Sequence, residues 1–287
     1  MSFLTRTGKP LPKSILDSAE AAKKDPVNRR EFLALASAFG ATTATAYAMI
    51  GMPAPAFAAA HKEGGTVRMQ MEVRALKDPR TYDWSQIANF SRGWLEYLAI
   101  WENDGTFTPA LLESWEINDN ATEYTLNVRK GVTWNDGTPF TAADVVRNII
   151  GWCDKSVEGN SMAGRFATLI DEETGKAIDG AITAVDDHTV KLALPRPDIT
   201  LIPGMADYPA AIVPEGFDAE NMLENPIGTG AYLPESLEVG VKSVLVKNTD
   251  HKWWGTEVYG GPYIDRLEYI DYGTDPSAFV AAAEAEE

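Results

Sequence analysis

The stretch from Leu111 to Arg129, LLESWEINDNATEYTLNVR, contains the clearest structural pattern in the chain. Polar and apolar residues alternate on both sides of the NDN tripeptide at residues 118–120, which favours a turn. Because alternation with a period of two buries one face of a strand, the stretch predicts a β-hairpin. Residues 182–194 repeat the pattern around a DDH turn and predict a second hairpin.

Other elements extend outward from these hairpins. Thr141 with Asp144 three residues later is close to a capping box and predicts the start of a helix. The apolar residues from Ile87 to Ile100 recur at helical spacing and predict another helix. Further strands are expected at residues 66–73, 231–233, 243–247 and 267–272. The order of elements favours a mixed α+β or α/β domain over a regular doubly wound sheet.

The composition excludes several classes of function. The chain has 287 residues, with 25 basic and 42 acidic side chains and a net charge of −17, the wrong sign for wrapping a phosphate backbone. Its single cysteine, Cys153, cannot form an internal disulfide, and no cluster of cysteines and histidines indicates zinc. Phosphate-binding glycine loops and common hydrolase signatures are also absent. We therefore expect no nucleic-acid partner, no metal, no cofactor and no catalytic residue.

The first 58 residues have the pattern of a twin-arginine signal. Arg29 and Arg30 precede an uncharged stretch that begins at Leu33 and ends in a small-x-small site formed by Ala56 and Ala58. A membrane anchor and a buried helix are the alternatives, but glycines, prolines and many small residues make the stretch only weakly apolar. We expect cleavage after this site and an exported mature protein.

The C-terminal sequence begins a helix at Pro276 and then stops without a glycine or a basic last turn. This pattern indicates that the chain is a fragment, and a frayed natural terminus is the alternative.

Four blocks of sequence resemble one known family, both in composition and in order. The blocks are PALLESWE at 109–116, YTLNVRKGVTWNDGTPFTAADVV at 124–146, NPIGTGAY at 225–232, and WWG with YIDRL within 253–267. From about Gly64 onward the chain resembles the family 5 extracellular solute-binding proteins, the dipeptide, oligopeptide and nickel binders of ABC importers. We expect the glycines in these blocks to serve turns with positive φ or close approaches: Gly131, Gly137, Gly228 and Gly230.

The resemblance implies a periplasmic-binding-protein-like trap with two lobes that close on a ligand. After the signal region at 1–58, it implies lobe I at 59–270, with an inserted β-rich subdomain at about 105–205. Residues 271–287 would be the crossover and the start of lobe II. Lobe II is then almost entirely missing.

The resemblance also implies where a ligand would contact lobe I. Aromatic side chains usually fill cores, but the loop before the helix predicted at Ile87 lacks helical periodicity and can present rings for stacking. In the family, lobe I contacts come from this loop, from the segment after the first subdomain helix, and from a later segment. The candidate ligand-binding residues are Tyr82, Trp84, Asn89, Arg165 and Tyr208.

The function implied is that of a periplasmic substrate-binding protein of an ABC transporter. It would capture a small solute, in the first place a short peptide, and deliver it to the permease subunits. The twin-arginine export machinery would be a further partner, and the mature protein is expected to be a monomer that is not embedded in the membrane. A metal complex or a sugar stays open as ligand. An exported hydrolase acting on a polymer and a lone lobe acting as an interaction module are the alternative functions.

Overall fold

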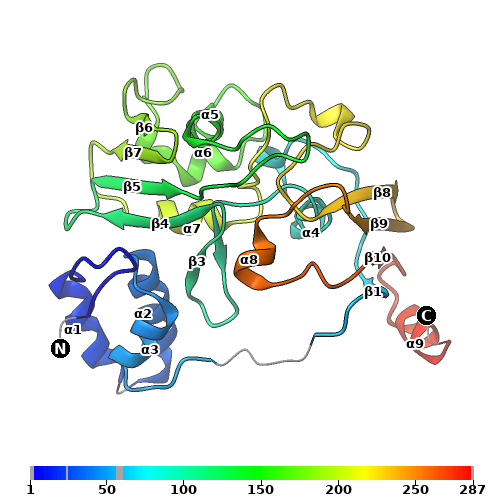
Figure 1. Cartoon of the computed structure of the whole chain (residues 1–287), viewed down its shortest axis with the longest axis horizontal. Coiled ribbons are helices and arrows are strands. Elements are labelled where there is room, and N and C mark those ends of the chain that lie inside the picture. Colours follow the sequence, from blue (N-terminus) through cyan, green and yellow to red (C-terminus); the bar gives the residue numbers. More distant parts are fainter. Residues whose placement is uncertain (1–2, 24, 56–60, 286–287) are drawn as a thin grey trace. The chain divides into compact units, whose positions relative to one another are not determined.

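A computed structural model describes residues 3–23, 25–55 and 61–285 and divides the chain into two compact units (Figure 1). Unit 1 comprises Met1–Ala58, Tyr97–Lys130 and Thr141–Ala210. Unit 2 comprises Ala59–Glu96, Gly131–Phe140 and Ala211–Glu287. Each unit is therefore assembled from separate pieces of sequence and has its own sheet. The lobe and subdomain boundaries expected from the sequence stay a prediction.

Unit 1 is built around a four-stranded antiparallel sheet with the strand order β4-β5-β7-β6. Its strands are β4 (Leu112–Ile117), β5 (Glu123–Val128), β6 (Ile182–Asp186) and β7 (Thr189–Ala193). Both predicted hairpins are confirmed. Tyr124, Leu126 and Val128 are buried on one face of β5, as the alternating pattern requires.

The helices and the small hairpin of unit 1 complete its fold. Helix α5 (Ala142–Trp152) packs against β6 and β7. The Thr141 backbone N–H donates to Asp144 Oδ2 over 2.9 Å, which confirms the predicted capping box. The remaining elements are β2 (Ala99–Trp101), β3 (Phe107–Pro109), α6 (Met162–Arg165), the 3₁₀ helix Ala167–Leu169 and α7 (Leu201–Ala206).

Unit 2 contains a four-stranded mixed sheet with the order β1-β10-β9-β8. Its strands are β1 (Thr66–Gln70), β8 (Tyr232–Glu238), β9 (Lys242–Lys247) and β10 (Arg266–Ile270). Strand β1 runs parallel to β10, whereas β9 is antiparallel to both of its neighbours. The outer elements are α4 (Ser85–Ser91), α8 (Gly255–Tyr259), α9 (Pro276–Glu284) and two 3₁₀ helices at Pro79–Thr81 and Ala219–Asn221.

A buried carboxylate links three strands of this sheet. Glu268 on β10 accepts a hydrogen bond from Arg266 Nε at 2.8 Å. It also lies 3.0 Å from Lys242 Nζ on β9 and accepts a hydrogen bond from Arg68 Nε on β1 at 3.3 Å. Hydrogen bonds from Arg266 and Lys242, helped by Arg68, lower the pKa of Glu268 to about 2.

The helix predicted from Ile87 to Ile100 is wrong beyond Ser91. Helix α4 ends there, and the chain turns through Gly93 and Trp94 before entering unit 1. The Trp94 carbonyl accepts the N–H of Gly230 over 3.0 Å. A continuous helix would use this carbonyl internally, so a contact more than a hundred residues along the chain overrides the local pattern.

Residues 3–23 and 25–55 form three helices in unit 1, α1 (Lys13–Ala22), α2 (Pro26–Ala38) and α3 (Thr43–Met49). Arg29 and Arg30 lie on α2, whereas the predicted cleavage-site residues Ala56 and Ala58 lie outside the described residues. In the part of the chain that the structure describes, no helix has the length and apolar character needed to cross a membrane. The interpretation of this segment as a signal stays a prediction.

Candidate functional site

The predicted ligand-binding residues divide between the two units. Tyr82, Trp84 and Asn89 belong to unit 2, and Arg165 and Tyr208 belong to unit 1. They therefore form two separate groups, each built by its own unit.

Trp84 is the exposed aromatic residue of the first group. It precedes α4, and 46% of its surface is exposed. The guanidinium carbon of Arg74 lies 4.0 Å from the centre of the indole ring, a cation–π contact. Arg74 NH2 also donates to Glu72 Oε1 at 2.7 Å. The indole is thus supported by a charged side chain and still offers surface to a ligand.

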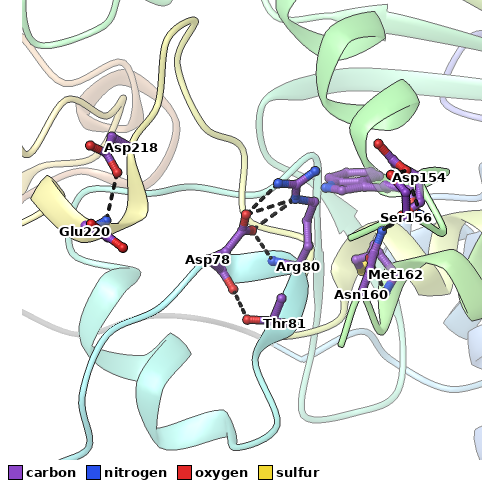
Figure 2. A network of polar contacts seen from close by, with 10 residues as sticks. Asp78, Arg80, Thr81, Asp154, Ser156, Asn160, Met162, Asp218 and Glu220 are labelled. Carbon is purple, nitrogen blue, oxygen red and sulfur yellow. Dashed lines mark hydrogen bonds and ion pairs between the residues drawn. The ribbon is translucent and has the colours of Figure 1, made fainter. Parts of the chain in front are cut away.

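The loop before Trp84 is held by its own polar contacts, as Figure 2 shows for Asp78, Arg80 and Thr81. Asp78 Oδ1 accepts the Arg80 backbone N–H at 3.0 Å, and Thr81 Oγ1 donates to the Asp78 carbonyl at 2.8 Å. Lys77 Nζ lies 2.8 Å from Asp83 Oδ1, and this hydrogen bond lowers the pKa of Asp83. These contacts restrict the backbone next to Trp84, which reduces the entropy lost when a ligand binds.

Tyr82 and Asn89 are placed differently from Trp84. Tyr82 is 1% exposed and packs in the interior of unit 2. Asn89 Nδ2 lies 3.7 Å from the sulfur of Met71, and its Oδ1 accepts a hydrogen bond from Arg92 NH1 at 3.1 Å. Among these three candidates, Trp84 has the most accessible side chain, and the ligand-binding roles of all three stay predictions.

Arg165 and Tyr208 are brought together in unit 1. The guanidinium carbon of Arg165 lies 5.8 Å from the centre of the Tyr208 ring. Arg165 Nε donates to Asp207 Oδ2 at 2.6 Å, and its NH1 donates to the Ser161 carbonyl at 2.8 Å. Tyr97 donates its hydroxyl proton to the Tyr208 carbonyl over 2.7 Å. The arginine and the tyrosine are therefore fixed in one group, in which Arg165 pairs with Asp207, the residue before Tyr208.

The turn before α6 positions Arg165. Asn160 Oδ1 accepts the Met162 N–H at 3.0 Å, and Asn160 Nδ2 donates to the Asp154 carbonyl at 2.8 Å (Figure 2). Hydrogen bonds from Lys176 and Ser156 lower the pKa of Asp154 to about 2, so this carboxylate is charged at neutral pH. The turn is thus closed by ionic and amide contacts that set the direction of α6.

Sequence reasoning missed Arg74 and Asp207. Neither residue belongs to a recognisable motif, and each acts through a partner that only the tertiary structure brings near. The available signal for Arg74 was its position between the first strand and a loop rich in aromatic residues. For Asp207 the signal was its place directly before the candidate Tyr208.

Two of the family-like blocks, at 225–232 and within 253–267, build a junction in unit 2. Glu96 accepts hydrogen bonds from Trp253 Nε1 at 2.9 Å, from Trp254 Nε1 at 2.6 Å and from Thr229 Oγ1 at 2.7 Å. Three donors on one carboxylate make a strong, charge-assisted anchor. Through these bonds Glu96, the last residue of the piece Ala59–Glu96 of unit 2, holds the segment that follows β9.

Two glycines allow the chain to approach closely at this junction. A Cβ on Gly228 would lie 1.9 Å from the Trp94 carbonyl oxygen, and one on Gly230 would lie 2.5 Å from the Gly93 carbonyl oxygen. Gly131 and Gly137 instead have φ of 74° and 89°. Both expected reasons for glycine are therefore present, close approach at one pair and left-handed backbone at the other.

Nucleophilic chemistry at Cys153 is not supported by its surroundings. The thiol is buried, and burial raises its pKa to about 12. Among residues 3–23, 25–55 and 61–285, no group of three or more histidine, cysteine and acidic side chains is arranged to hold a metal ion.

Comparison with known proteins gives one family. The model of the bacterial extracellular solute-binding proteins, family 5 Middle, matches residues 106–287. The chain is 31% identical over 221 residues to the periplasmic murein peptide-binding protein MppA of Escherichia coli (strain K12), covering 68% of this chain and 39% of that protein. It is 29% identical over 192 residues to the periplasmic oligopeptide-binding protein OppA of the same organism, covering 62% and 34%. The chain thus spans well under half the length of these relatives.

Solved structures show the same fold. The unliganded open form of the MppA murein tripeptide binding protein superposes with a TM-score of 0.64 at 24% identity, covering 79% of this chain and 44% of that chain. OppA of Haemophilus influenzae, solved with the peptide RPPGFSPFR, gives a TM-score of 0.64 at 22% identity, covering 78% and 45%. The mixed α/β, periplasmic-binding-protein-like fold class is therefore confirmed, for part of the larger chains.

Proposed function

Because the chain belongs to the bacterial extracellular solute-binding proteins of family 5, we propose that it forms most of the ligand-capturing first lobe of an ABC importer's receptor. The solute would be a short peptide in the first place, held without chemical change and passed to the permease subunits. The names of the relatives support this ligand, since MppA and OppA are described as murein peptide-binding and oligopeptide-binding.

The observation that carries the proposal is the half-exposed indole of Trp84 on a loop held by its own contacts. A ring that is supported from one side and open to solvent can cover an apolar or planar part of a ligand. Because Lys77 and Asp83 tie the loop together, the ring is already positioned before a ligand arrives.

Arg165 and Tyr208 form the second patch in this proposal. The guanidinium is engaged with Asp207 and the Ser161 carbonyl, so it orients its neighbours more than it offers a free charge. Tyr208 supplies an aromatic face and a hydroxyl, which suit a peptide's mixture of apolar and polar groups.

The cellular setting is part of the same proposal. Periplasmic relatives such as OppA and the paired arginines of α2 support export by the twin-arginine machinery, with the mature protein acting as a monomer in the periplasm. Protein recovered from the periplasm that begins after Ala58 would support this route, and protein that keeps residues 1–58 there would contradict it.

Calorimetric titration of the complete gene product tests the ligand. Relatives include a probable deoxycholate-binding protein, and one solved structure holds agropinic acid, so di-, tri- and tetrapeptides should be tested beside deoxycholate and a sugar acid. A peptide at one hundred times its Kd should stabilise the protein by about 2.7 kcal/mol. A heat of binding with any peptide, together with a rise in Tm, supports the proposal. The absence of both with every peptide overturns it.

A matched pair of variants then tests the site. Trp84→Ala should weaken peptide binding by about tenfold or more. Trp101→Ala is the control, because Trp101 is a 60% exposed tryptophan of unit 1 outside the proposed site. Equal affinities in the two variants would remove Trp84 from the site while leaving the receptor function open to its own test.

A further inference from the structure

The N-terminal segment 3–55 has a hydrophobic core of its own. Helix α2 packs against both α1 and α3. The buried apolar side chains come from all three helices and from residues before, between and after them: Leu11, Ile15, Ala19, Ala22, Phe32, Leu33, Ala36, Phe39, Ala41, Ala46, Tyr47, Met49 and Ile50. Burial of this many apolar side chains stabilises one defined fold of the segment.

This segment is bonded to the sheet of unit 1 through buried groups. Trp115 on β4 donates its Nε1–H to the Ala38 carbonyl over 2.8 Å. The Phe107 N–H on β3 donates to Ser37 Oγ over 2.8 Å. Ile117 of β4 packs against the helical core. If the segment left, a buried indole N–H and a buried backbone N–H would lose their partners.

Two polar contacts extend the docking surface at its edges. The Lys9 ammonium pairs with the Glu116 carboxylate of β4. Burial raises the pKa of Glu116, but Lys9 and Thr7 outweigh it and the net pKa is lowered. The Tyr47 hydroxyl of α3 hydrogen-bonds Asp104 in the loop between β2 and β3. Residues from both ends of the segment therefore contact unit 1's strands and their loop.

Glycines stand at two of the closest approaches. Gly40 has a φ of +86°, and a Cβ there would lie 3.1 Å from the Trp115 carbonyl oxygen. Gly105 has a φ of +91°, and a Cβ there would lie 3.0 Å from Arg30 Cγ. Both glycines have a backbone conformation that favours glycine. Gly40 lies close to β4 of the sheet, and Gly105 lies close to α2 of the N-terminal segment.

The two arginines of the docked segment differ in solvent exposure. On α2 the side chain of Arg30 is exposed, whereas that of Arg29 is half-buried. The Nε of Arg29 is buried and has no hydrogen-bond partner among the described residues. A partner that binds both guanidinium groups would therefore find one of them exposed and the other partly covered. Arg29 acts electrostatically on the Tyr47 hydroxyl, which hydrogen-bonds Asp104, so its side chain lies near the loop between β2 and β3.

We propose that residues 3–55 are a cap docked on the β3–β4 surface, defined as Asp104, Gly105, Phe107 and Trp115–Ile117. In this proposal docking is what partly covers Arg29, so both arginines become fully accessible to a binding partner only when the cap is released. The biological meaning rests on the proposed export of the protein, but the docking does not involve a ligand. If the ligand titration failed, the proposal of a docked cap would still stand. If the cap experiments failed, the proposal of ligand binding would still stand.

Arginine modification of the full chain by phenylglyoxal tests the cap, with each site read by peptide mass spectrometry. In the unchanged protein Arg29 should react several times more slowly than Arg30. Ser37→Ala and Trp115→Phe each remove one docking hydrogen bond, and each should favour release by about tenfold. Arg29 should then approach the rate of Arg30. Ser18→Ala is the control, since Ser18 Oγ donates to the Ile15 carbonyl at 2.9 Å, a bond within α1.

Amide hydrogen exchange separates release of the cap from unfolding of the sheet. Exchange at Phe107 should accelerate in Trp115→Phe, where its acceptor Ser37 is unchanged, while Leu126, in the middle of the sheet, stays protected. Equal reactivity of Arg29 and Arg30 in the unchanged protein would overturn the proposal. So would exchange at Phe107 that always follows Leu126, because the helices would then be an inseparable part of the unit.

Discussion

Unit 2 holds tryptophans in two contrasting ways. At the junction, Trp253 and Trp254 donate both indole N–H groups to the Glu96 carboxylate, and Trp254 is buried. In the loop before α4, Trp84 is 46% exposed and rests against Arg74. The tryptophans of the matching blocks therefore build the scaffold, whereas Trp84, the ring we propose for ligand binding, lies outside these blocks.

The largest effect is expected where the junction has no space. Gly228→Ala places a Cβ 1.9 Å from the Trp94 carbonyl oxygen, and backbone cannot move aside as a flexible side chain can. The free energy of unfolding should fall by about 3 kcal/mol or more. Urea unfolding followed by circular dichroism measures it.

Gly164→Ala is the control for this substitution. Gly164 lies in α6 with no atom within 4 Å of its added Cβ, so helix propensity should leave stability unchanged or raise it by up to about 1 kcal/mol. Similar losses in both variants would mean that the close approach is not what requires glycine at 228.

The junction carboxylate should have the next largest effect. Glu96→Gln replaces one acceptor oxygen with an amide N–H₂ that faces donors, and it removes the charge from three hydrogen bonds. We expect a loss of about 2–3 kcal/mol. Thermal unfolding checks this beside Glu123→Gln, an exposed position at the start of β5 where the change should stay within about 0.5 kcal/mol. A loss at Glu96 as small as at Glu123 would contradict the anchor role.

These expectations show which features the sequence could predict. The two hairpins and the start of α5 were predicted correctly because strand alternation, turn residues and the Thr141–Asp144 box act within a few residues. The helix through Gly93 and Trp94 failed because that backbone bonds Gly230. A local sequence pattern carries no information about a hydrogen bond to a residue so far along the chain.

The candidate site was predictable in a similar, partial way. The resemblance selected Arg165 and Tyr208, and the structure places them in one group. Arg74 and Asp207 escaped because their contacts, with Trp84 and Arg165 respectively, exist only after folding. A charged residue that supports a ring has no spacing rule by which to find it.

A third prediction uses pH and the sheet carboxylate of unit 2. The Glu268 pKa of about 2 lies below the usual value of about 4.3 for an unfolded chain. A depressed pKa stabilises the fold fully above the unfolded value, and this contribution is lost as pH falls from about 4.3 to 2. Glu268→Gln should therefore lower the free energy of unfolding by about 1–3 kcal/mol at pH 7, and by less at pH 3.

Urea unfolding at the two pH values measures the difference. Glu235→Gln is the matched control, because Glu235 also pairs with Arg266 but its side chain is 45% exposed, so solvent screening should make its effect on stability clearly smaller than that of Glu268→Gln. A loss at Glu268 that is the same at pH 7 and pH 3 would show that shape, and not charge, is what the sheet requires there.

The smallest effect on stability, and the most informative about the site, is expected at Arg74. Arg74→Met keeps an apolar stem against Trp84 but removes the guanidinium, its cation–π contact and its bond to Glu72. The free energy of unfolding should change by less than about 1 kcal/mol.

The indole N–H resonance of Trp84, assigned through Trp84→Phe in ¹⁵N-labelled protein, should shift because the ring loses its support. In the complete gene product, peptide affinity should fall about three- to tenfold, since a mobile ring must be ordered on binding. Lys252→Met is the control, because it breaks an exposed ion pair of unit 2, with Glu257, that lies outside this loop. An unmoved Trp84 resonance in Arg74→Met would contradict the support role, and it would place the order of this ring in the loop backbone held by Asp78 and Thr81.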